Sequence, residues 1–275
     1  MAVTTMEIPA PFHAAVEEIM ARAADRAIMP RLGKLLAEDK HEKAIGELVT
    51  IADRESEQIL AEGLLRLLPE ASIVGEEAAD ADPAIMAKIG GRLCWIIDPL
   101  DGTSNFARGE GPFGILVALA ERGQPIGGWI YDPRSRRFCA AARNSGAFIN
   151  GERTWVPPAT RASPLVAISS LVSRMPDGDQ MIERFSGSFA TIPIPRCAAA
   201  QYPSMVLGEN DIALFGRTLP WDHAAGVLFL AEAGGIATRL DGSPYRVDDG
   251  RPGLVAAGSE RLWAKAMAIL EDVGT

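Results

Sequence analysis

The second half of the chain alternates short apolar runs with stretches of helical period. After Pro157 and Pro158, strand-like runs cover residues 165–169, 189–194, 212–215 and 254–257, and helical patterns cover residues 179–185, 199–207, 223–233 and 260–270. A chain in which strands alternate with helices folds into a sheet with helices packed on it. Residues 156–275 are therefore predicted to form a layered α/β unit.

The first half follows a different pattern. The spacing of apolar side chains predicts helices over residues 12–23 and 50–68. Apolar runs predict strands at residues 71–74, 93–97, 115–120, 126–131 and 137–142, and turn residues between the last three indicate a meander. Residues 38–46 are charged and aperiodic, which predicts a mobile loop. We expect an α+β unit over residues 1–155, with the boundary near residues 152–160.

Composition and charge argue against several classes of function. The 27 basic and 36 acidic residues give a net charge of −9, which argues against a nucleic-acid-binding or anionic-membrane-binding surface. No apolar run approaches the roughly 20 residues that cross a bilayer, and the N-terminus lacks a signal-peptide pattern. Cys94, Cys139 and Cys197 are too far apart for a disulfide framework or a metal-binding motif. We expect a cytoplasmic protein with neither nucleic acid nor membrane as a partner.

Residues 95–106 carry the most informative chemistry. An apolar strand delivers Asp98 at its end, and Pro99 and Gly102 predict a tight turn that brings Asp101 back beside it. Two carboxylates held this close repel each other unless a proton or a cation lies between them. Carboxylate oxygens without a His/Cys cluster suit Mg²⁺ or Mn²⁺ rather than zinc. After the turn, the N–H groups of Gly102 and Thr103 would point outward as a phosphate-binding site.

Taken alone, this segment also fits an ordinary turn, since Asp, Pro, Gly, Thr and Asn all favour turns. Two chemical alternatives fit less well. A phosphoaspartate phosphatase would have Asp-x-Asp-x-Thr, with the second Asp where Leu100 stands. A calcium loop would have acids at alternate positions and a distal Glu, which this spacing does not provide.

Three further motifs have ordinary structural explanations when each is taken alone. Glu76 and Glu77 follow a predicted strand and fit a solvated acidic pair, Asp222 fits a helix N-cap, and Thr50-x-x-Asp53 fits a capping box. The histidines are far apart and lack metal-ligand spacing. His223, beside Asp222, is expected to support a neighbour or to be exposed rather than to be catalytic.

Together, the order and spacing of these motifs resemble the inositol monophosphatase family, within the lithium-sensitive, Mg²⁺-dependent phosphatase superfamily. The matching runs cover residues 47–53, 75–77, 95–106, 146–151, 221–226 and 232–235. The resemblance extends over nearly the whole chain. It implies the layered αβαβα sandwich of the sugar phosphatase fold, a phosphoric monoester hydrolase, and a homodimer.

The resemblance also implies two or three Mg²⁺ ions, or Mn²⁺ in their place. The first ion would be held by Glu76, Asp98 and the Leu100 carbonyl, and the second by Asp98, Asp101 and Asp222. Glu76 would also help to hold a weaker third ion. These separated acids have no partner cations nearby in the sequence, so we expect them to need bound metal.

Catalytic and substrate-binding roles follow from the same resemblance. Thr103, hydrogen-bonded to Asp53, would orient and deprotonate a metal-activated water, and Glu76 would also be catalytic. The residues implied around the substrate are Gly102, Thr103, Ala198, Phe215 and Asp222. Lys43 lies about one residue away from the family's loop lysine.

The alcohol-binding side departs from the family pattern. Members that recognise inositol usually have an acid seven residues before the motif Asp, where this chain has Phe215, and residues 196–200 lack the usual Gly-Ser/Thr-Ala-Ala form. Losing such a hydrogen-bond partner costs roughly 1–3 kcal/mol. We expect a small phosphorylated alcohol as substrate, inositol-phosphate-like, with histidinol phosphate, fructose bisphosphate or a nucleotide phosphate as alternatives. Arg217 fits either a contact to a second anionic group or an ordinary surface arginine.

A regulatory binding protein that keeps this fold is the alternative from another class. Its mark would be a damaged set of metal ligands, and in this chain the set is complete.

Overall fold

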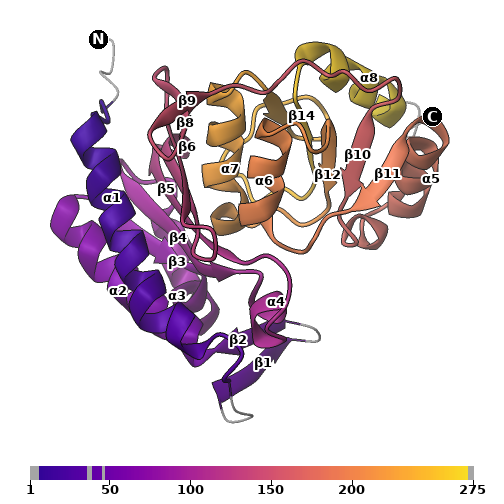
Figure 1. The fold of residues 1–275 in the computed structure, drawn as a ribbon. Coiled ribbons are helices and arrows are strands. Elements are labelled where there is room, and N and C mark those ends of the chain that lie inside the picture. Colours follow the sequence, from indigo (N-terminus) through magenta and orange to yellow (C-terminus); the bar gives the residue numbers. More distant parts are fainter. Residues whose placement is uncertain (1–5, 36–38, 45–46, 272–275) are drawn as a thin grey trace.

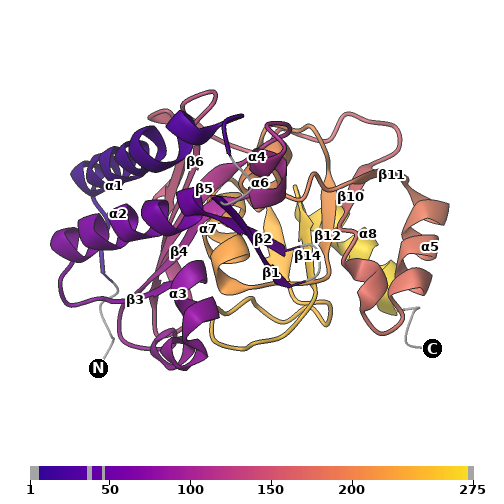
Figure 2. The same cartoon turned by 90° about the horizontal axis from the view of Figure 1, so that it is seen from below.

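The computed structural model describes residues 6–35, 39–44 and 47–271, with residues 40–44 and 47–48 described by their backbone alone. Within these ranges the chain forms five layers, helix–sheet–helix–sheet–helix (Figure 1). Figure 2 shows the same order from below. The predicted αβαβα sandwich is therefore confirmed.

The first sheet has seven strands in the order β3-β4-β5-β6-β7-β8-β9. Its strands are β3 Ser72–Gly75, β4 Cys94–Asp101, β5 Gly114–Glu121, β6 Gln124–Asp132, β7 Arg137–Ala142, β8 Gly146–Ile149 and β9 Glu152–Thr154. β3 and β4 are parallel, and every later pair in the sheet is antiparallel, as the predicted meander requires. The central strands are buried over nearly their whole length because helices cover both faces.

The second sheet has five strands in the order β11-β10-β12-β14-β13. Its strands are β10 Leu165–Ile168, β11 Ala190–Pro193, β12 Ile212–Phe215, β13 Ile236–Thr238 and β14 Leu254–Ala257. β10, β11 and β12 run parallel to one another. Their carboxyl ends therefore lie at one edge of the sheet.

Helices fill the three remaining layers. The outer layer of the first sheet has α1 Ala10–Ala23 and α2 Ile51–Leu67, the middle layer has α6 Ala198–Val206 and α7 Pro220–Glu232, and the far layer has α5 Gly178–Ser188 and α8 Glu260–Glu271 (Figure 1). Two short helices, α3 Glu76–Ala81 and α4 Thr103–Ala107, directly follow β3 and Gly102. Short π and 3₁₀ segments occupy Ala24–Ile28, Met29–Arg31, Pro83–Lys88 and Val172–Arg174.

Three apolar cores separate the layers. One lies between α1, α2 and the first sheet, one surrounds α6 and α7 between the sheets, and one lies between the second sheet and the outer helices α5 and α8. Helices of the second half form the middle layer, and their core includes residues of both sheets. The division into residues 1–155 and 156–275 is a proposal, because the two parts share this layer. No helix in the described part of the chain has both the length and the apolar character needed to cross a bilayer.

The loop predicted over residues 38–46 is wrong where the structure describes it. β1 Lys40–Ala44 pairs antiparallel with β2 Glu47–Thr50, while residues 38, 45 and 46 lie outside the described residues. Backbone hydrogen bonds hold such a ribbon, so it forms without an apolar pattern in its sequence.

Candidate active site

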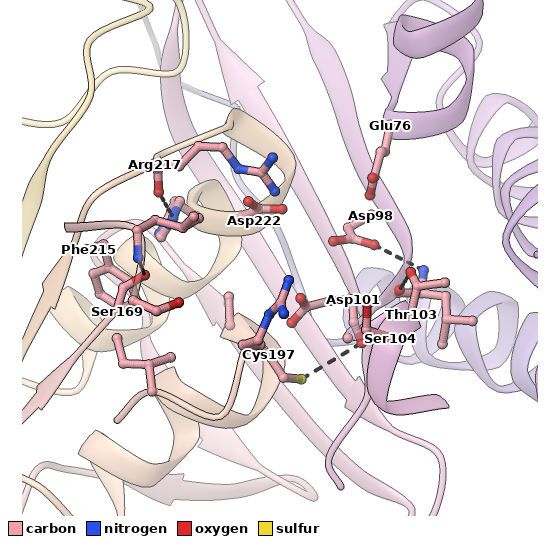
Figure 3. Close-up of a pocket in the computed structure, with 18 residues that line it drawn as sticks. Glu76, Asp98, Asp101, Thr103, Ser104, Ser169, Cys197, Phe215, Arg217 and Asp222 are labelled. Atoms are coloured by element: carbon pink, nitrogen blue, oxygen red, sulfur yellow. Dashed lines mark hydrogen bonds between the residues drawn. The ribbon is translucent and has the colours of Figure 1, made fainter. Parts of the chain in front are cut away.

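Parallel pairing of β3 and β4 brings two acidic residues together. Gly75 pairs with Ile97, so the residues that follow, Glu76 and Asp98, leave the two strands at the same edge of the sheet. Asp222 reaches this edge from the first turn of α7, in the other half of the chain. One carboxylate oxygen each of Glu76, Asp98 and Asp222 lies within 4.8 Å of the other two (Figure 3).

Asp98 and Asp101 are brought together by a bulge rather than by the predicted turn. β4 continues to Asp101, and between its pairings Asp98–Leu116 and Asp101–Gly114 it contains one residue more than β5. The Leu100 N–H donates to Asp98 Oδ1 at 3.0 Å. Gly102 then adopts φ +83°, a left-handed conformation that favours glycine, and α4 begins at Thr103.

Asp101 also connects the two halves of the chain. Its Oδ2 accepts a hydrogen bond of 2.6 Å from the Ala199 N–H at the start of α6. The N–H groups of Ala198 and Gly102 stabilise the same carboxylate, yet burial still raises the pKa of Asp101 to about 6. The Asp101 carboxylate is thus held in place by backbone amides, with an edge facing the pocket.

Burial and mutual repulsion make this acidic group unfavourable without a cation. Asp98 is only 2% exposed. Burial, followed by repulsion from Glu76, Asp101 and Asp222, raises the pKa of Asp98 well above its ordinary value. A cluster of hard carboxylate oxygens under such repulsion fits a divalent ion such as Mg²⁺ or Mn²⁺.

The fold brings two cationic side chains to these acids. Arg196 and Arg217 line the same pocket as the carboxylates. Both are remote in sequence from Asp98 and Glu76, and reach the pocket through the second sheet.

Thr103 and Asp53 form the predicted pair. Thr103 Oγ1 lies 2.9 Å from Asp53 Oδ1 and equally 2.9 Å from the Leu100 carbonyl oxygen. Asp53 Oδ2 accepts from the Thr50 N–H at 2.8 Å and from Thr50 Oγ1 at 2.6 Å, which confirms the capping box of α2. Burial raises the pKa of Asp53 to about 6. Asp53 therefore both caps a helix and orients Thr103.

Glu57, which the sequence did not single out, fixes the helix that carries Glu76. Its Oε2 and Oε1 accept from the N–H groups of Glu77 and Ala78 at 2.8 and 2.9 Å, in the first turn of α3. Gly75 leaves room for this carboxylate, since a Cβ atom there would lie 2.3 Å from Glu57 Oε2. The only sequence signal for Glu57 was its place four residues after Asp53, on the same predicted helix.

Phe215, which stands where the family pattern has an acid, is buried. It is 4% exposed, its ring stacks on Tyr202 at 5.4 Å, and it meets the edge of His223 at 4.8 Å. His223 is buried, so the alternative that it is exposed is wrong. The N-cap explanation of Asp222 is also wrong, because Leu219 is the N-cap of α7.

Most of the predicted residues share one pocket. It is lined by Glu76, Asp98, Leu100, Asp101, Gly102, Thr103, Ala198, Phe215 and Asp222 (Figure 3). Asp53 stands behind Thr103, and the side chain of Lys43 lies outside the described residues. Sequence reasoning missed several other lining residues, among them Ser169 and Arg196. Their signal was that Ser169 ends one predicted strand and Arg196 closely follows another.

Comparison with known proteins gives consistent matches. The sequence profile of the Inositol monophosphatase family matches residues 10–274. The chain is 30% identical to a fructose-1,6-bisphosphatase/inositol-1-monophosphatase of Aquifex aeolicus over 90% of each chain, and 32% identical to an inositol-1-monophosphatase of Rhizobium meliloti over 90% of this chain and 96% of the relative. An IMPase structure from Thermotoga maritima superposes with a TM-score of 0.76 at 25% identity, covering 94% of this chain and 95% of that one.

Proposed function

The chain belongs to the inositol monophosphatase family of phosphoric monoester hydrolases, and we propose that its pocket holds divalent metal ions and hydrolyses a small phosphorylated alcohol. The observation that carries this proposal is the convergence of Glu76, Asp98 and Asp222, from both halves of the chain, to within 4.8 Å. Three acids gathered in a pocket, one of them buried, have no evident purpose without a cation.

The donor set divides into two or three ion sites. One Mg²⁺ or Mn²⁺ ion would be held by Glu76, Asp98 and the Leu100 carbonyl, and a second ion by Asp98, Asp101 and Asp222. Glu76 would also contribute to a weaker third site, where Li⁺ would inhibit. When bound, such ions lower the pKa of water and offset the charge of the leaving alkoxide.

Thr103 and Asp53 provide a path for the proton of the attacking water. The Thr103 hydroxyl donates toward Asp53 Oδ1, which leaves the lone pairs of Thr103 Oγ1 able to accept a proton. Asp53 Oδ2 is already occupied by two donors from Thr50, so Oδ1 is the oxygen that would receive the Thr103 proton. The raised pKa of Asp53 makes it a stronger base than an exposed aspartate.

The start of α4 would bind the phosphate. Gly102 and Thr103 line the pocket, and their N–H groups belong to the first turn of that helix, where N–H groups attract anions. The Gly102 N–H is shared with the Asp101 carboxylate. Ala198, Phe215 and Asp222 would border the alcohol portion of the substrate.

Names of the relatives suggest inositol phosphate and fructose bisphosphate among the substrates to test. Histidinol phosphate and a nucleotide phosphate complete the set of alternatives. We further propose a cytoplasmic homodimer, with neither nucleic acid nor membrane as a partner.

Phosphate release from a panel of these esters, with and without Mg²⁺, tests the proposal. Asp98→Asn should abolish Mg²⁺-dependent release yet stay folded by circular dichroism, because removing one charge relieves repulsion among the acids. Asp80→Asn, an exposed acid on α3, is the matched control and should keep full activity. Retained activity in Asp98→Asn would remove Asp98 from the site. No release by the wild-type chain from any ester would favour the regulatory alternative.

A further inference from the structure

The pocket wall opposite β4 is built by three adjacent parallel strands. Ser169 follows β10, Arg196 follows β11 and Arg217 follows β12, so the order β11-β10-β12 places all three at one edge of the second sheet. Ligands of layered α/β proteins bind at this kind of edge, beyond the carboxyl ends of parallel strands. All three residues line the pocket. Figure 3 shows Ser169 and Arg217 on the side opposite Asp98 and Thr103.

The backbone that carries Arg217 is fixed by buried groups. His223 Nε2 donates to the Arg217 carbonyl oxygen at 3.1 Å, which leaves His223 Nδ1 to accept from the Tyr202 hydroxyl at 2.8 Å. The next residue, Thr218, accepts from Arg239 Nη1 at 2.8 Å and donates to the Arg251 carbonyl at 2.6 Å. Arg217 thus has an exposed side chain on a well-held backbone.

Arg196 is held in a similar way. Its φ of +54° lies in the left-handed region, which is uncommon for a residue other than glycine and which clusters at functional sites. The preceding carbonyl, of Pro195, accepts from Asn105 Nδ2 at 2.9 Å. Asn105 belongs to α4, so the segment that carries Arg196 is tied to the helix proposed to bind phosphate.

The same wall carries an apolar residue, Phe215, at the end of β12. Phe215 cannot hydrogen-bond the hydroxyl groups of a neutral polyol, and its ring is fixed against Tyr202 and His223. Guanidinium groups bind phosphate and carboxylate through paired hydrogen bonds. In a chain of net charge −9, two arginines at the mouth of an acidic pocket also offset the repulsion that a highly charged anionic substrate would meet there.

We propose that Arg196 and Arg217 form a second anion subsite that selects phosphomonoesters whose alcohol portion carries a further phosphate or carboxylate group. This inference rests on the proposed phosphatase function and concerns its substrate class. Ser169 contributes a hydroxyl at the same edge.

Two matched pairs of esters test the subsite in the metal-loaded enzyme. Fructose 1-phosphate against fructose 1,6-bisphosphate adds a second phosphate, and glycerol 2-phosphate against 2-phosphoglycerate adds a carboxylate. We expect kcat/KM to favour the more anionic member of at least one pair by about tenfold or more, since a hydrogen bond to a charged group has an effect of that order. The pair that shows the preference identifies the group that is bound.

Arginine variants then assign the preference to residues. Arg217→Gln and Arg196→Gln should each reduce the ratio of kcat/KM within the preferred pair, mainly through a higher KM for the anionic member. Arg66→Gln removes the same charge from an exposed site on α2 and should leave the ratio unchanged. Thermal unfolding of each variant checks that the fold is intact.

The outcomes separate this inference from the proposed function. Equal kcat/KM within both pairs, or a preference that survives both arginine substitutions, would overturn the subsite and leave the phosphatase proposal standing. If the enzyme releases phosphate from neither member of either pair nor from any other ester, the proposed function itself fails.

Discussion

At the scale of single residues, the site depends on carboxyl groups with perturbed proton affinity. Asp53 combines a structural contact with a proposed catalytic one. One of its oxygens closes the capping box of α2, and the other meets Thr103 Oγ1. Burial raises its pKa to about 6, close to the near-neutral pH at which a general base is most effective.

Thr103→Val should lower kcat by roughly 10²–10⁴-fold at saturating Mg²⁺, the usual range for loss of a general acid–base group. Valine has the shape of threonine without the hydroxyl. Thr103→Ser keeps the hydroxyl and is the matched control, expected to retain most activity. Steady-state phosphate release measures both, and equal kcat for the Val and Ser variants would contradict the proton path.

The pH dependence of kcat follows from Asp53. At saturating Mg²⁺, kcat should fall below about pH 6, where Asp53 becomes protonated and can no longer accept a proton. Burial raises the pKa of Asp53 from 3.8 to about 6, so between these two pH values Asp53 binds more protons in the folded chain than in the unfolded chain. Its contribution to the free energy of unfolding therefore increases as the pH falls from about 6 to 3.8. A profile that stays flat down to pH 5, with Thr103 intact, would exclude Asp53 as the base.

The sequence alone predicted those site residues that belong to local motifs. Asp98, Asp101 and Asp222 stand in motifs that predict acids at element ends, and all three line the pocket. Glu57 and Arg196 were not predicted, because each acquires its place only when strands and helices distant in sequence pack together. Phe215 was predicted at the end of an apolar strand, but its aromatic partners were not predicted.

At the scale of elements, the position of Glu76 depends on how α2 and α3 are joined. The Glu57 carboxylate on α2 satisfies two N–H groups at the start of α3, which would otherwise lack partners within that helix. The start of α3, and with it the proposed metal ligand Glu76, is therefore fixed relative to the buried helix surface that also carries Asp53.

Glu57→Gln should weaken Mn²⁺ binding by about tenfold, an effect usual for groups that orient metal ligands. The Gln oxygen can accept from only one N–H group, and its amide would oppose the other, so the free energy of unfolding should also fall by about 1–3 kcal/mol. Kcat should recover at high Mn²⁺ concentration, which a general loss of folding would not allow.

Glu62→Gln is the control for that experiment, because Glu62 is an exposed acid on the same helix. Calorimetric titration with Mn²⁺ gives the affinities. Unchanged binding in Glu57→Gln would show that α3 keeps its place without this carboxylate.

Long elements were easier to predict than short ones. Apolar periodicity predicted the main helices and strands, whereas α3 and α4 are too short to show a period. The bulge in β4 was predicted as a turn because Pro99 and Gly102 favour turns, but pairing with β5 on either side keeps the segment extended. The β1–β2 ribbon was missed because its pairing leaves no apolar pattern.

At the scale of the whole molecule, the proposed metal site requires both halves to keep their relative position. α7 carries Asp222 in its first turn and Glu232 at its end, where the Glu232 carboxylate accepts from the N–H groups of Asn144 and Gly146 at 2.8 Å each. These bonds tie α7 to the turn between β7 and β8. At the other side of the pocket, Asp101 accepts from Ala199 on α6. The middle layer is thus joined to the first sheet by carboxylates from each half.

Titration of the metal-stripped chain with Mn²⁺, followed by electron paramagnetic resonance, tests the central proposal most directly. The wild-type chain should bind at least two ions, and Asp222→Asn, a change in the second half, should weaken binding as much as Asp98→Asn in the first, by about tenfold or more. Asp80→Asn should bind like the wild type. If Asp222→Asn binds Mn²⁺ as tightly as the unaltered chain, the two halves do not share a metal site and the account is wrong.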